Sequence, residues 1–425
     1  MQELFSIAMK FNRFGRTFLL LIGITFLINL FIYEFSSSAG NNVILQTINL
    51  FRSKPTDYIQ LELSERRNNM SNFCHRQVSQ NTTKSTLKKM KRNLMYSPEK
   101  KFLYCPVAKV GSTFWLRLFL ILNGVSKTNN PFNVSENIYS KNYTAIKEET
   151  TVIRNSLKFI MVREPYSRLL SAYANKLFDI NPIYWSGYGR RVIKVVRKIP
   201  SNKSLSCGHD VTFPELVRYV VKPSAVKDSH FIPISNVCSP CAVKYDIIGK
   251  METFKRDTLH VLGRLNLTQL VMSGVLQAMK ESVEIDAIKS STNNLMNYLS
   301  KEGTLKCVTH EEAFKRKWRN LQLRGIIGSD VKYPFKKGEE ETITRSQILA
   351  VFQNASRRSG SRESRRKNRE LSLFEAYSKV EKKYLIQLSK YFKNDCSAFS
   401  YECRPSKIFQ NNQNPHTNFF EIEGL

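Results

Sequence analysis

A short polar turn between two apolar runs has the residue types needed to hold an anion. Its five residues are Lys109, Val110, Gly111, Ser112 and Thr113. Residues 102–104 before the turn predict a strand, and residues 114–122 after it favour a helix, whose first backbone N–H groups attract a phosphate or sulfate. The order differs from the nucleotide P-loop, G-x-x-x-x-G-K-[ST], because here the lysine precedes a single glycine. The turn indicates an anion site of another kind, and a plain turn with a solvated lysine is the alternative.

A second segment, VREPYSRLLSAY, places an arginine and a serine where they can hold another anion. Arg163 follows residues 157–162, an apolar run that predicts a strand, and Pro165 suits the first turn of a helix. Ser171 comes eight residues after Arg163, which is about two helical turns. An arginine can hold a phosphate through two parallel hydrogen bonds, so the segment predicts a phosphate site. An ion pair between Arg163 and Glu164 is the alternative.

The rest of the chain repeats this pattern of strand and helix. Residues 245–249 predict a third strand, and residues 166–178 and 252–265 carry apolar side chains at helical spacing. The alternation favours an α/β fold with a parallel sheet, and a further helix is expected over residues 371–392. Because ligands of parallel sheets bind at the carboxyl ends of the strands, both turns should lie at the same edge of the sheet.

Together the two turns resemble the donor sites of sulfotransferases that use 3′-phosphoadenylyl sulfate (PAPS). They are most similar to the Golgi carbohydrate sulfotransferases of the HNK-1 and chondroitin 4-O-sulfotransferase family. The family's first motif, roughly P-K-V-G-S-T-x-W, is matched by residues 108–115, with Ala108 in place of proline, and the second, V-R-E-P-[FY]-x-R-L-x-S-A-[YF], by residues 162–173. The resemblance implies a P-loop-like sulfotransferase fold, with helices on a central parallel sheet. It also implies that the first turn cradles the 5′-phosphosulfate and that Arg163 and Ser171 hold the 3′-phosphate.

Two further stretches agree with this resemblance. Residues 230–253 follow the family pattern H-W-x-P … C-x-P-C … Y-D-x-[IV]-G-K-x-E-T, with Phe231 in place of the common tryptophan. Residues 384–402 loosely follow the family's closing helix. The resemblance therefore covers roughly residues 100–260 with specific motifs, and residues 371–402 weakly.

Sulfuryl transfer to a sugar hydroxyl needs a cation at the leaving phosphate and a base at the hydroxyl. Lys109 is the expected cation, helped by the hydroxyls of its turn. His230 is the expected base, because histidine titrates near neutral pH; a structural histidine that bonds a backbone carbonyl is the alternative. Glu252 is the substitute base, unless it pairs with Lys250 or Lys255. The reaction needs no metal.

The chain of 425 residues carries 66 basic and 35 acidic side chains, a formal net charge of +31. This excess indicates an anionic partner, such as a nucleic acid, a membrane surface or an acidic polymer. Residues 17–33 are uncharged and apolar, and as a helix they would span about 26 Å. They predict a transmembrane signal anchor, with residues 1–16 in the cytosol and the rest in the lumen, in a single-pass type II protein of the Golgi membrane. A signal peptide cleaved at residues 36–40 is the alternative.

Seven N-x-[ST] sequons and eight cysteines fit a lumenal chain. The cysteines predict disulfides whose pairing the sequence leaves open. Cys238 and Cys241 form a C-x-x-C, interpreted as part of a structural disulfide arrangement because no second Cys or His pair suggests zinc. In the lumen, an acidic glycan is a more natural partner than nucleic acid. The sequon asparagines are Asn69, Asn81, Asn133, Asn142, Asn202, Asn266 and Asn354.

Composition divides the lumenal part into three segments. Residues 34–95 are polar and predict a stem, and residues 96–403 contain the motifs of the catalytic domain. Within that domain, residues 354–370 form a basic, low-complexity insert that is expected to be disordered or a solvated loop. Residues 404–425 predict a tail.

These features predict an enzyme that transfers a sulfuryl group from PAPS to a hydroxyl of an acidic glycan. The 4-O position of N-acetylgalactosamine in chondroitin or dermatan is the first expectation, and the 3-O position of glucuronic acid in an HNK-1-type glycan is the second. A membrane-tethered protein that binds acidic glycans without catalysis is the third. The basic insert would add long-range attraction for a polyanion. A lumenal kinase is disfavoured because the P-loop spacing is absent.

Overall fold

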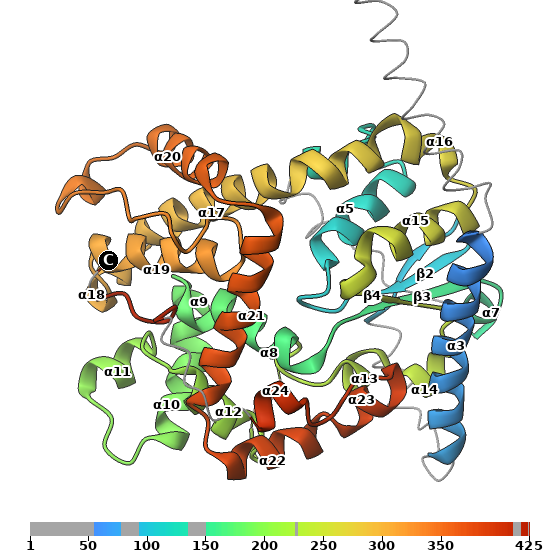
Figure 1. Cartoon of the computed structure of the whole chain (residues 1–425), viewed down its shortest axis with the longest axis horizontal. Helices are drawn as coiled ribbons and strands as arrows, with labels where there is room; N and C mark the ends of the chain where they lie inside the picture. The colour runs from blue at the N-terminus through green and yellow to red at the C-terminus, as the bar shows by residue number, and fades with distance from the viewer. Residues whose placement is uncertain (1–54, 78–92, 135–149, 226–227, 411–417, 424) are drawn as a thin grey trace, which may run out of the picture. The chain divides into compact units, whose positions relative to one another are not determined.

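The computed structural model describes residues 55–77, 93–134, 150–225, 228–410, 418–423 and 425 (Figure 1). The chain divides into two compact units, Met1–Leu61 and Glu62–Leu425. Of the first unit, only residues 55–61, the start of one helix, are described. Among the described residues, no helix combines the length and the apolar character needed to cross a membrane. The expected anchor at residues 17–33 and the cytosolic tail lie outside the described residues and stay predictions.

Four strands form one sheet in the order β1-β2-β3-β4. The strands are β1 (Met95–Ser97), β2 (Phe102–Cys105), β3 (Leu157–Val162) and β4 (Ile247–Lys250). β2, β3 and β4 run parallel, which confirms the predicted parallel α/β sheet, and β1 adds an antiparallel edge that the sequence did not predict. The three parallel strands are almost entirely buried, as expected for strands covered on both faces, and they therefore read as continuous apolar runs.

Two helices that follow parallel strands lie on the same side of the sheet (Figure 1). They are α5 (Ser112–Leu122), which follows β2, and α15 (Phe254–Arg264), which follows β4 after the 3-10 turn η4 (Met251–Thr253). Trp115 of α5 packs on Phe159 of β3, with 4.5 Å between the ring centroids, and Phe114 meets Phe254 of α15 edge to face at 5.4 Å. This aromatic packing fixes the start of α5 against the strand ends.

The segment after β3 starts with α8 (Pro165–Tyr173), as the proline at its first turn predicted. The Glu164 carboxylate caps this helix by accepting the N–H groups of Tyr166 and Ser167 at 2.9 and 2.7 Å. The π-helical turn η2 (Ala174–Phe178) continues it, so the helix expected over residues 166–178 is confirmed. The capped start places Arg163 directly at the carboxyl end of β3.

Two hydrophobic clusters organise the remaining helices. One surrounds Tyr166 and Tyr377 and joins α8 to α12, α21 and α22, and the other surrounds Trp318 and joins α17, α19 and α20. The helix expected over residues 371–392 is the end of α21 followed by α22. The other helices and helical turns are α3 (Pro55–Arg76), η1 (Pro131–Asn133), α7 (Thr150–Arg154), α9 (Pro182–Tyr184), η3 (Trp185–Gly189), α10 (Arg190–Val196), α11 (Asn202–Cys207), α12 (Phe213–Val220), α13 (Ile234–Cys238), α14 (Pro240–Val243), α16 (Thr268–Leu270), η5 (Val271–Val275), η6 (Ala278–Ser282), α17 (Val283–Leu299), α18 (Thr304–Cys307), α19 (His310–Leu323), η7 (Glu339–Glu341), α20 (Arg345–Arg358), α21 (Arg362–Ser378), α22 (Lys382–Tyr391), α23 (Lys393–Phe399) and α24 (Ser406–Phe409).

The predicted stem, residues 34–95, is wrong for its described part from Glu62 onward. Leu63, Met70 and Phe73 share one face of α3 and are each at most 6% exposed, so this part of the helix belongs to the folded domain. The buried Arg66 of the same helix donates to the Asp257 carboxylate of α15 at 2.6 Å. Polar composition on the outer face of α3 concealed the apolar stripe.

The basic insert, residues 354–370, is not a disordered loop, because it forms the end of α20 and the start of α21. Arg365 is buried, and its guanidinium donates to both carboxylate oxygens of Glu284 at 3.0 and 3.2 Å. The Ser361 hydroxyl caps α21 by accepting the N–H of Ser364 at 3.1 Å. A partner distant in sequence therefore stabilises a segment whose local composition suggested disorder.

The expected tail, residues 404–425, packs on the domain where it is described. Ile408 of α24 and Phe419 are 8% and 3% exposed and belong to the cluster around Tyr166. The backbone N–H of Phe419 also donates to the buried Glu375 carboxylate of α21 at 2.9 Å. Few but well-buried side chains hold this segment, which explains why its composition read as a tail.

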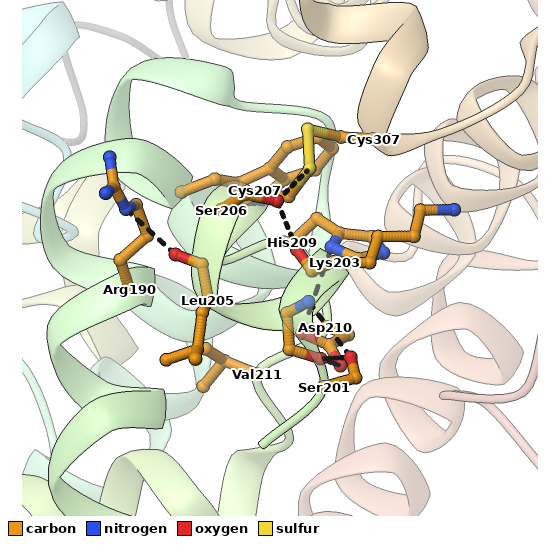
Figure 2. Close-up of polar contacts among 12 residues, drawn as sticks. Arg190, Ser201, Lys203, Leu205, Ser206, Cys207, His209, Asp210, Val211 and Cys307 are labelled. Carbon is orange, nitrogen blue, oxygen red and sulfur yellow. Dashed lines mark hydrogen bonds and ion pairs between the residues drawn. A yellow bond between two sulfur atoms is a disulfide. The ribbon is translucent and has the colours of Figure 1, made fainter.

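All eight cysteines form disulfides, as the sequence predicted, and the structure gives their pairing. Cys238 and Cys241 do not bond each other, because each bonds a distant cysteine, and this agrees with a structural role. Figure 2 shows the third bond, which ties α11 to α18 beside His209. The pairs are Cys74–Cys241, Cys105–Cys238, Cys207–Cys307 and Cys396–Cys403.

Candidate active site

The two predicted anion-binding turns meet at the carboxyl ends of β2 and β3. These strands are neighbours in the parallel part of the sheet. The guanidinium of Arg163 donates from Nη1 to the carbonyl oxygen of Lys109 at 3.2 Å, and from Nε to the Ser167 hydroxyl at 3.1 Å. Segments that lie 54 residues apart therefore form one continuous wall. The side chain of Arg163 is half-buried, so it is held in place but open to a ligand.

The first turn has the backbone needed for close approach of an anion. Lys109 and Gly111 both adopt left-handed conformations, with φ of 70° and 77°. A Cβ on Gly111 would lie 2.5 Å from a ring carbon of Phe254, so only glycine fits here. Gly111 has no side chain with which to cap α5, and the first turn of α5 contains no acidic residue. The first N–H groups of α5, from the half-buried Ser112 and the exposed Thr113, are therefore suited to an anion. The Val110 side chain is buried, so its contribution is confined to the backbone.

Positive charge surrounds the side chain of Lys109. Burial holds the pKa of Lys109 well below its usual value, and the positive charges of Arg324, Lys176 and Arg163 lower this pKa further. Asp179 acts in the opposite direction, but its carboxylate also accepts from Lys317 at 2.7 Å. A desolvated cation among like charges gains stability when an anion binds, so these residues are arranged for a strongly anionic ligand.

Ser171, the second residue expected to hold a phosphate, lies on α8 and is half-buried. Among the described residues it makes no hydrogen bond with the other predicted site residues. Its role at a phosphate stays a prediction that rests on the resemblance. The alternative for Arg163, an ion pair with Glu164, does not occur, because the Glu164 carboxylate caps α8 instead.

His230 lies in the loop before α13 and faces a carboxylate. Its Nδ1 is 2.8 Å from Asp228 Oδ1 and also 2.8 Å from the Tyr184 hydroxyl, which itself lies 3.2 Å from Asp228 Oδ2. With the proton on Nδ1, the ring donates to Asp228 and leaves Nε2 as an acceptor. Burial lowers the pKa of His230 below 6.5, Asp228 raises it, and Lys176 and Lys109 lower it. The imidazole is therefore neutral at pH 7 and able to accept a proton.

Glu252, the substitute base, follows β4 and has partners on both carboxylate oxygens. Its Oε1 accepts the backbone N–H of Glu164 at 3.1 Å, and its Oε2 accepts the Tyr401 hydroxyl at 3.0 Å. The alternative, an ion pair of Glu252 with Lys250 or Lys255, does not form; the Lys250 ammonium lies instead over the Tyr401 ring, 4.2 Å from its centroid. These bonds make Glu252 a link between the segments after β3 and β4, and the geometry favours His230 as the base.

Among the other histidines, His209 is packed away from this wall. It is 8% exposed and meets the Trp185 ring edge to face at 6.2 Å. Figure 2 shows it beside the Cys207–Cys307 disulfide and Asp210. His416 lies outside the described residues.

Sequence reasoning missed Arg168, which connects the first turn, residues 109–113, to the His230 loop; we call this turn the donor turn after its predicted ligand. This buried arginine of α8 donates from Nε to the carbonyl of Ala108 at 3.1 Å. Its Nη1 and Nη2 donate to the carbonyls of Ile232 and Ser229, both at 2.7 Å. Arg168 is part of the motif that revealed Arg163, but only the fold shows that it binds carbonyls on both sides of His230.

Asp395 of α23, also missed, holds the same loop from its other end. Its carboxylate accepts the N–H of Ile234 at 2.6 Å and that of Ser235 at 2.8 Å, and it is 1% exposed. Burial raises the pKa of the Asp395 carboxyl group, while the bonds from Ser235 and Ile234 and the charge of Arg168 act in the opposite direction. The only sequence signal was the weak similarity over residues 384–402.

Two more cations near Lys109, Lys176 and Arg324, carried no motif. Lys176 lies on η2 with its ammonium 4.5 Å from the centre of the Tyr184 ring. Arg324 directly follows α19, which packs on η2 through a 2.7 Å bond from Asn320 to the Ala174 carbonyl. Arg324 is exposed, and its Nη1 donates to the Ser291 hydroxyl of α17 at 3.1 Å. Both residues are identified as part of the site by their charge effect on Lys109, a proximity that the order of residues in the sequence does not reveal.

The fold and the site define an α/β protein in which parallel strand ends present two anion-binding turns beside a neutral histidine. The model of the sulfotransferase family matches residues 92–327, more than half of the chain. The chain belongs to this family.

Curated relatives are carbohydrate sulfotransferases. Carbohydrate sulfotransferase 11 of Rattus norvegicus is 32% identical over 224 residues, which cover 48% of this chain and 64% of the relative. Carbohydrate sulfotransferase 14 of Danio rerio is 34% identical over 189 residues, or 43% and 51% of the two chains. Carbohydrate sulfotransferase 9 of Homo sapiens is 29% identical over 208 residues, or 47% and 46%. The chain thus spans less than two thirds of the length of these relatives, and no solved structure matches it.

Proposed function

We propose that this protein transfers a sulfuryl group from PAPS to a hydroxyl of a glycan. The observation that carries the proposal is the 3.2 Å bond from Arg163 to the Lys109 carbonyl, which joins the two anion-binding turns into one site. PAPS carries anionic groups at the 5′ and the 3′ position of its ribose, and two adjoining anion sites suit such a donor. Membership of the sulfotransferase family and the printed names of the relatives support this donor and a carbohydrate acceptor.

The residues of the two turns fit the two ends of the donor. The open N–H groups at the start of α5, with the hydroxyls of Ser112 and Thr113, would hold the 5′-phosphosulfate. Arg163 and Ser171 would hold the 3′-phosphate, in line with the resemblance. Bound anions would also restore the pKa of Lys109, because they offset the positive charges that lower it.

The transfer requires a base and a stabilised leaving group. The acceptor oxygen forms a bond to sulfur while the bond from sulfur to the 5′-phosphate oxygen breaks, and Nε2 of His230 takes the hydroxyl proton. Asp228 holds the productive tautomer and stabilises the imidazolium that forms. Lys109 stabilises the negative charge that grows on the leaving phosphate oxygen. His230 then releases the proton to solvent.

The acceptor that we propose first is the 4-O position of N-acetylgalactosamine in chondroitin or dermatan. The 3-O position of glucuronic acid in an HNK-1-type glycan is the second candidate. The likeness of both turns to that family supports these choices, and the cations Lys176 and Arg324 suit a glycan that carries carboxylates. A protein that binds glycans without catalysis would not need the neutral histidine paired with Asp228.

We also propose that the protein acts in the Golgi lumen, anchored by residues 17–33. Four disulfides support an oxidising compartment. The five described sequon asparagines are all exposed, as glycosylation requires. These residues are Asn69, Asn133, Asn202, Asn266 and Asn354.

A transfer assay with labelled PAPS tests the proposal. Acceptors would be chondroitin, dermatan, desulfated heparan and a glucuronyl-lactosamine glycan, with disaccharide analysis of the products. We expect sulfate on N-acetylgalactosamine, and a loss of at least about 100-fold in Lys109→Ala and Arg163→Ala. Lys194→Ala, on the exposed face of α10, is the matched control and should behave as wild type. Retention on chondroitin without turnover of any acceptor would contradict the enzyme and support the non-catalytic alternative.

A further inference from the structure

Four exposed cations border the proposed transfer site and continue beyond it. None of them forms an ion pair with a carboxylate in the described part of the chain. They come from three elements that are distant in sequence: α15, η6 and α21. We call this set the basic track; its residues are Lys255, Lys280, Arg362 and Arg369.

One end of the basic track touches the cations around Lys109. Arg369 of α21 donates from Nη1 to the carbonyl of Arg324 at 3.3 Å. Arg324 is the nearby charge with the strongest influence on Lys109, and Arg369 exerts a like-charge effect on Arg163. The positive field of the transfer site therefore continues onto α21.

At the other end of the track, Lys255 of α15 and Lys280 of η6 lie near Arg362, the first residue of α21. Arg362 donates from Nη2 to the carbonyl of Lys280 at 3.1 Å, which ties α21 to η6. Lys280 and Arg362 both lower the pKa of Lys255, after the larger effect of burial. Lys255 follows Phe254, whose ring contacts Gly111 of the donor turn. Lys255 therefore lies on the helix whose first residue packs on the first turn.

The spacing along α21 gives the track its direction. Arg362 and Arg369 are seven residues apart, which places them two turns and about 10 Å apart on the same side of the helix. Arg366 lies between them but pairs with Glu363 and Glu370, so it does not count as a free cation. Figure 1 shows α21 running from the turn after α20 past the start of α8, and the Tyr377 hydroxyl bonds the Tyr166 carbonyl at 2.9 Å.

We propose that the basic track binds an anionic polysaccharide, namely the part of a glycan chain that extends beyond the sugar held for sulfuryl transfer. Like charges held together without counter-charges repel one another, and a polymer with a carboxylate or sulfate on each repeat relieves that repulsion. A short acceptor would fill the transfer site and meet at most Arg369, whereas a long chain would also reach Lys255, Lys280 and Arg362. This inference rests on the proposed function, and it adds to that function a preference for long acceptor chains.

A triple variant separates the track from the transfer site. Lys255→Gln, Lys280→Gln and Arg362→Gln together remove three charges, and the control triple Arg191→Gln, Lys194→Gln and Lys198→Gln removes three exposed charges on and beside α10. Because an exposed ion pair contributes a few-fold at most, we expect the KM for long chondroitin to rise about tenfold in the track variant. The KM for a tetrasaccharide should change less than about twofold, and the control should match wild type. Raising the salt to shorten the screening length should abolish the difference.

Binding measurements keep the test independent of turnover. The full-length track variant should elute from immobilised chondroitin sulfate at lower salt than the control, with an unchanged Tm. An unchanged KM for long chains would overturn the track, and so would an equal rise for the tetrasaccharide, which would place these cations in the transfer site itself. Weaker binding only to phosphatidylserine vesicles would assign the track to a membrane and also refute it. If wild type sulfates no acceptor, the proposed function fails, while the elution order still decides the track.

Discussion

At the scale of single residues, His230 is subject to opposing electrostatic effects. Burial and the nearby Lys109 and Lys176 favour the neutral ring, whereas Asp228 favours the protonated ring. The net effect lowers the pKa of His230 below 6.5, so the proposed base is already deprotonated at neutral pH. The same cations that would attract the proposed donor therefore also keep the His230 ring neutral. An anionic donor bound beside them would raise this pKa again and help His230 to take the proton.

This balance predicts the pH dependence of sulfuryl transfer. The kcat should fall as pH decreases through the His230 pKa, because the protonated ring cannot accept the hydroxyl proton, and the acidic limb of free-enzyme kcat/KM should lie below pH 6.5. Asp228→Asn removes the group that raises this pKa, so the limb should move to still lower pH while the plateau falls. His230→Gln should lower kcat by about 100-fold or more and remove the limb. A limb that survives in His230→Gln would assign the base to another residue, with Glu252→Gln as the next variant to measure.

At the scale of elements, Arg168 of α8 and the side-chain carboxylate of Asp395 of α23 hold the loop that carries His230. Arg168 binds the carbonyls of Ser229 and Ile232, and Asp395 binds the N–H groups that come after them in the chain. Arg168 also binds the carbonyl of Ala108, next to Lys109. The donor turn and the loop that carries His230 are therefore fixed relative to each other through the buried side chain of Arg168, which acts as a positioning residue.

Arg168→Lys should loosen both segments at once. A lysine keeps the charge but cannot reach three carbonyls in the guanidinium geometry, so we expect kcat to fall about 10-fold to 100-fold. Hydrogen exchange should increase in peptides covering residues 104–111 and 228–235, and the Asp395→Asn variant should affect only the second. The matched control is Arg190→Lys, whose Nε donates to the Leu205 carbonyl at 3.0 Å on another part of the fold (Figure 2). Increased exchange throughout the protein, or in neither segment, would refute the positioning role.

Local patterns predicted the elements of the proposed donor site, but not the elements that complete the domain. The strands and turns around Lys109 and Arg163 were predictable because each depends on a contiguous apolar run followed by its own helix start. The ordered part of α3, the start of α21 and the residues around Phe419 were assigned to a stem, a loop and a tail. Their order depends on distant partners, such as Asp257 for Arg66 and Glu284 for Arg365. Arg168 and Asp395 were missed for the same reason, since their ligands are backbone groups elsewhere in the fold.

At the scale of the whole molecule, the exposure of the sequon asparagines agrees with the proposed location in the Golgi lumen. All five described sequon asparagines are exposed, although several flank buried residues; Ser204, two residues after Asn202, is only 4% exposed. A glycan at each position would project from the surface without disturbing the core. The sites are spread over α3, η1, α11, the turn after α15 and α20.

The proposed lumenal orientation predicts stepwise glycosylation in cells. Expressed as the full chain, the protein should migrate faster after peptide N-glycosidase treatment, because the chain beyond residue 33 would have passed through the oxidising lumen. Asn202→Gln and Asn354→Gln should each remove one step of the shift, since both side chains are exposed. Asn129→Gln, an exposed asparagine outside any sequon, is the control and should leave the pattern unchanged. A chain that shows no shift, and whose cysteines react with thiol reagents in unreduced extracts, would place the domain in the cytosol and refute the type II anchor.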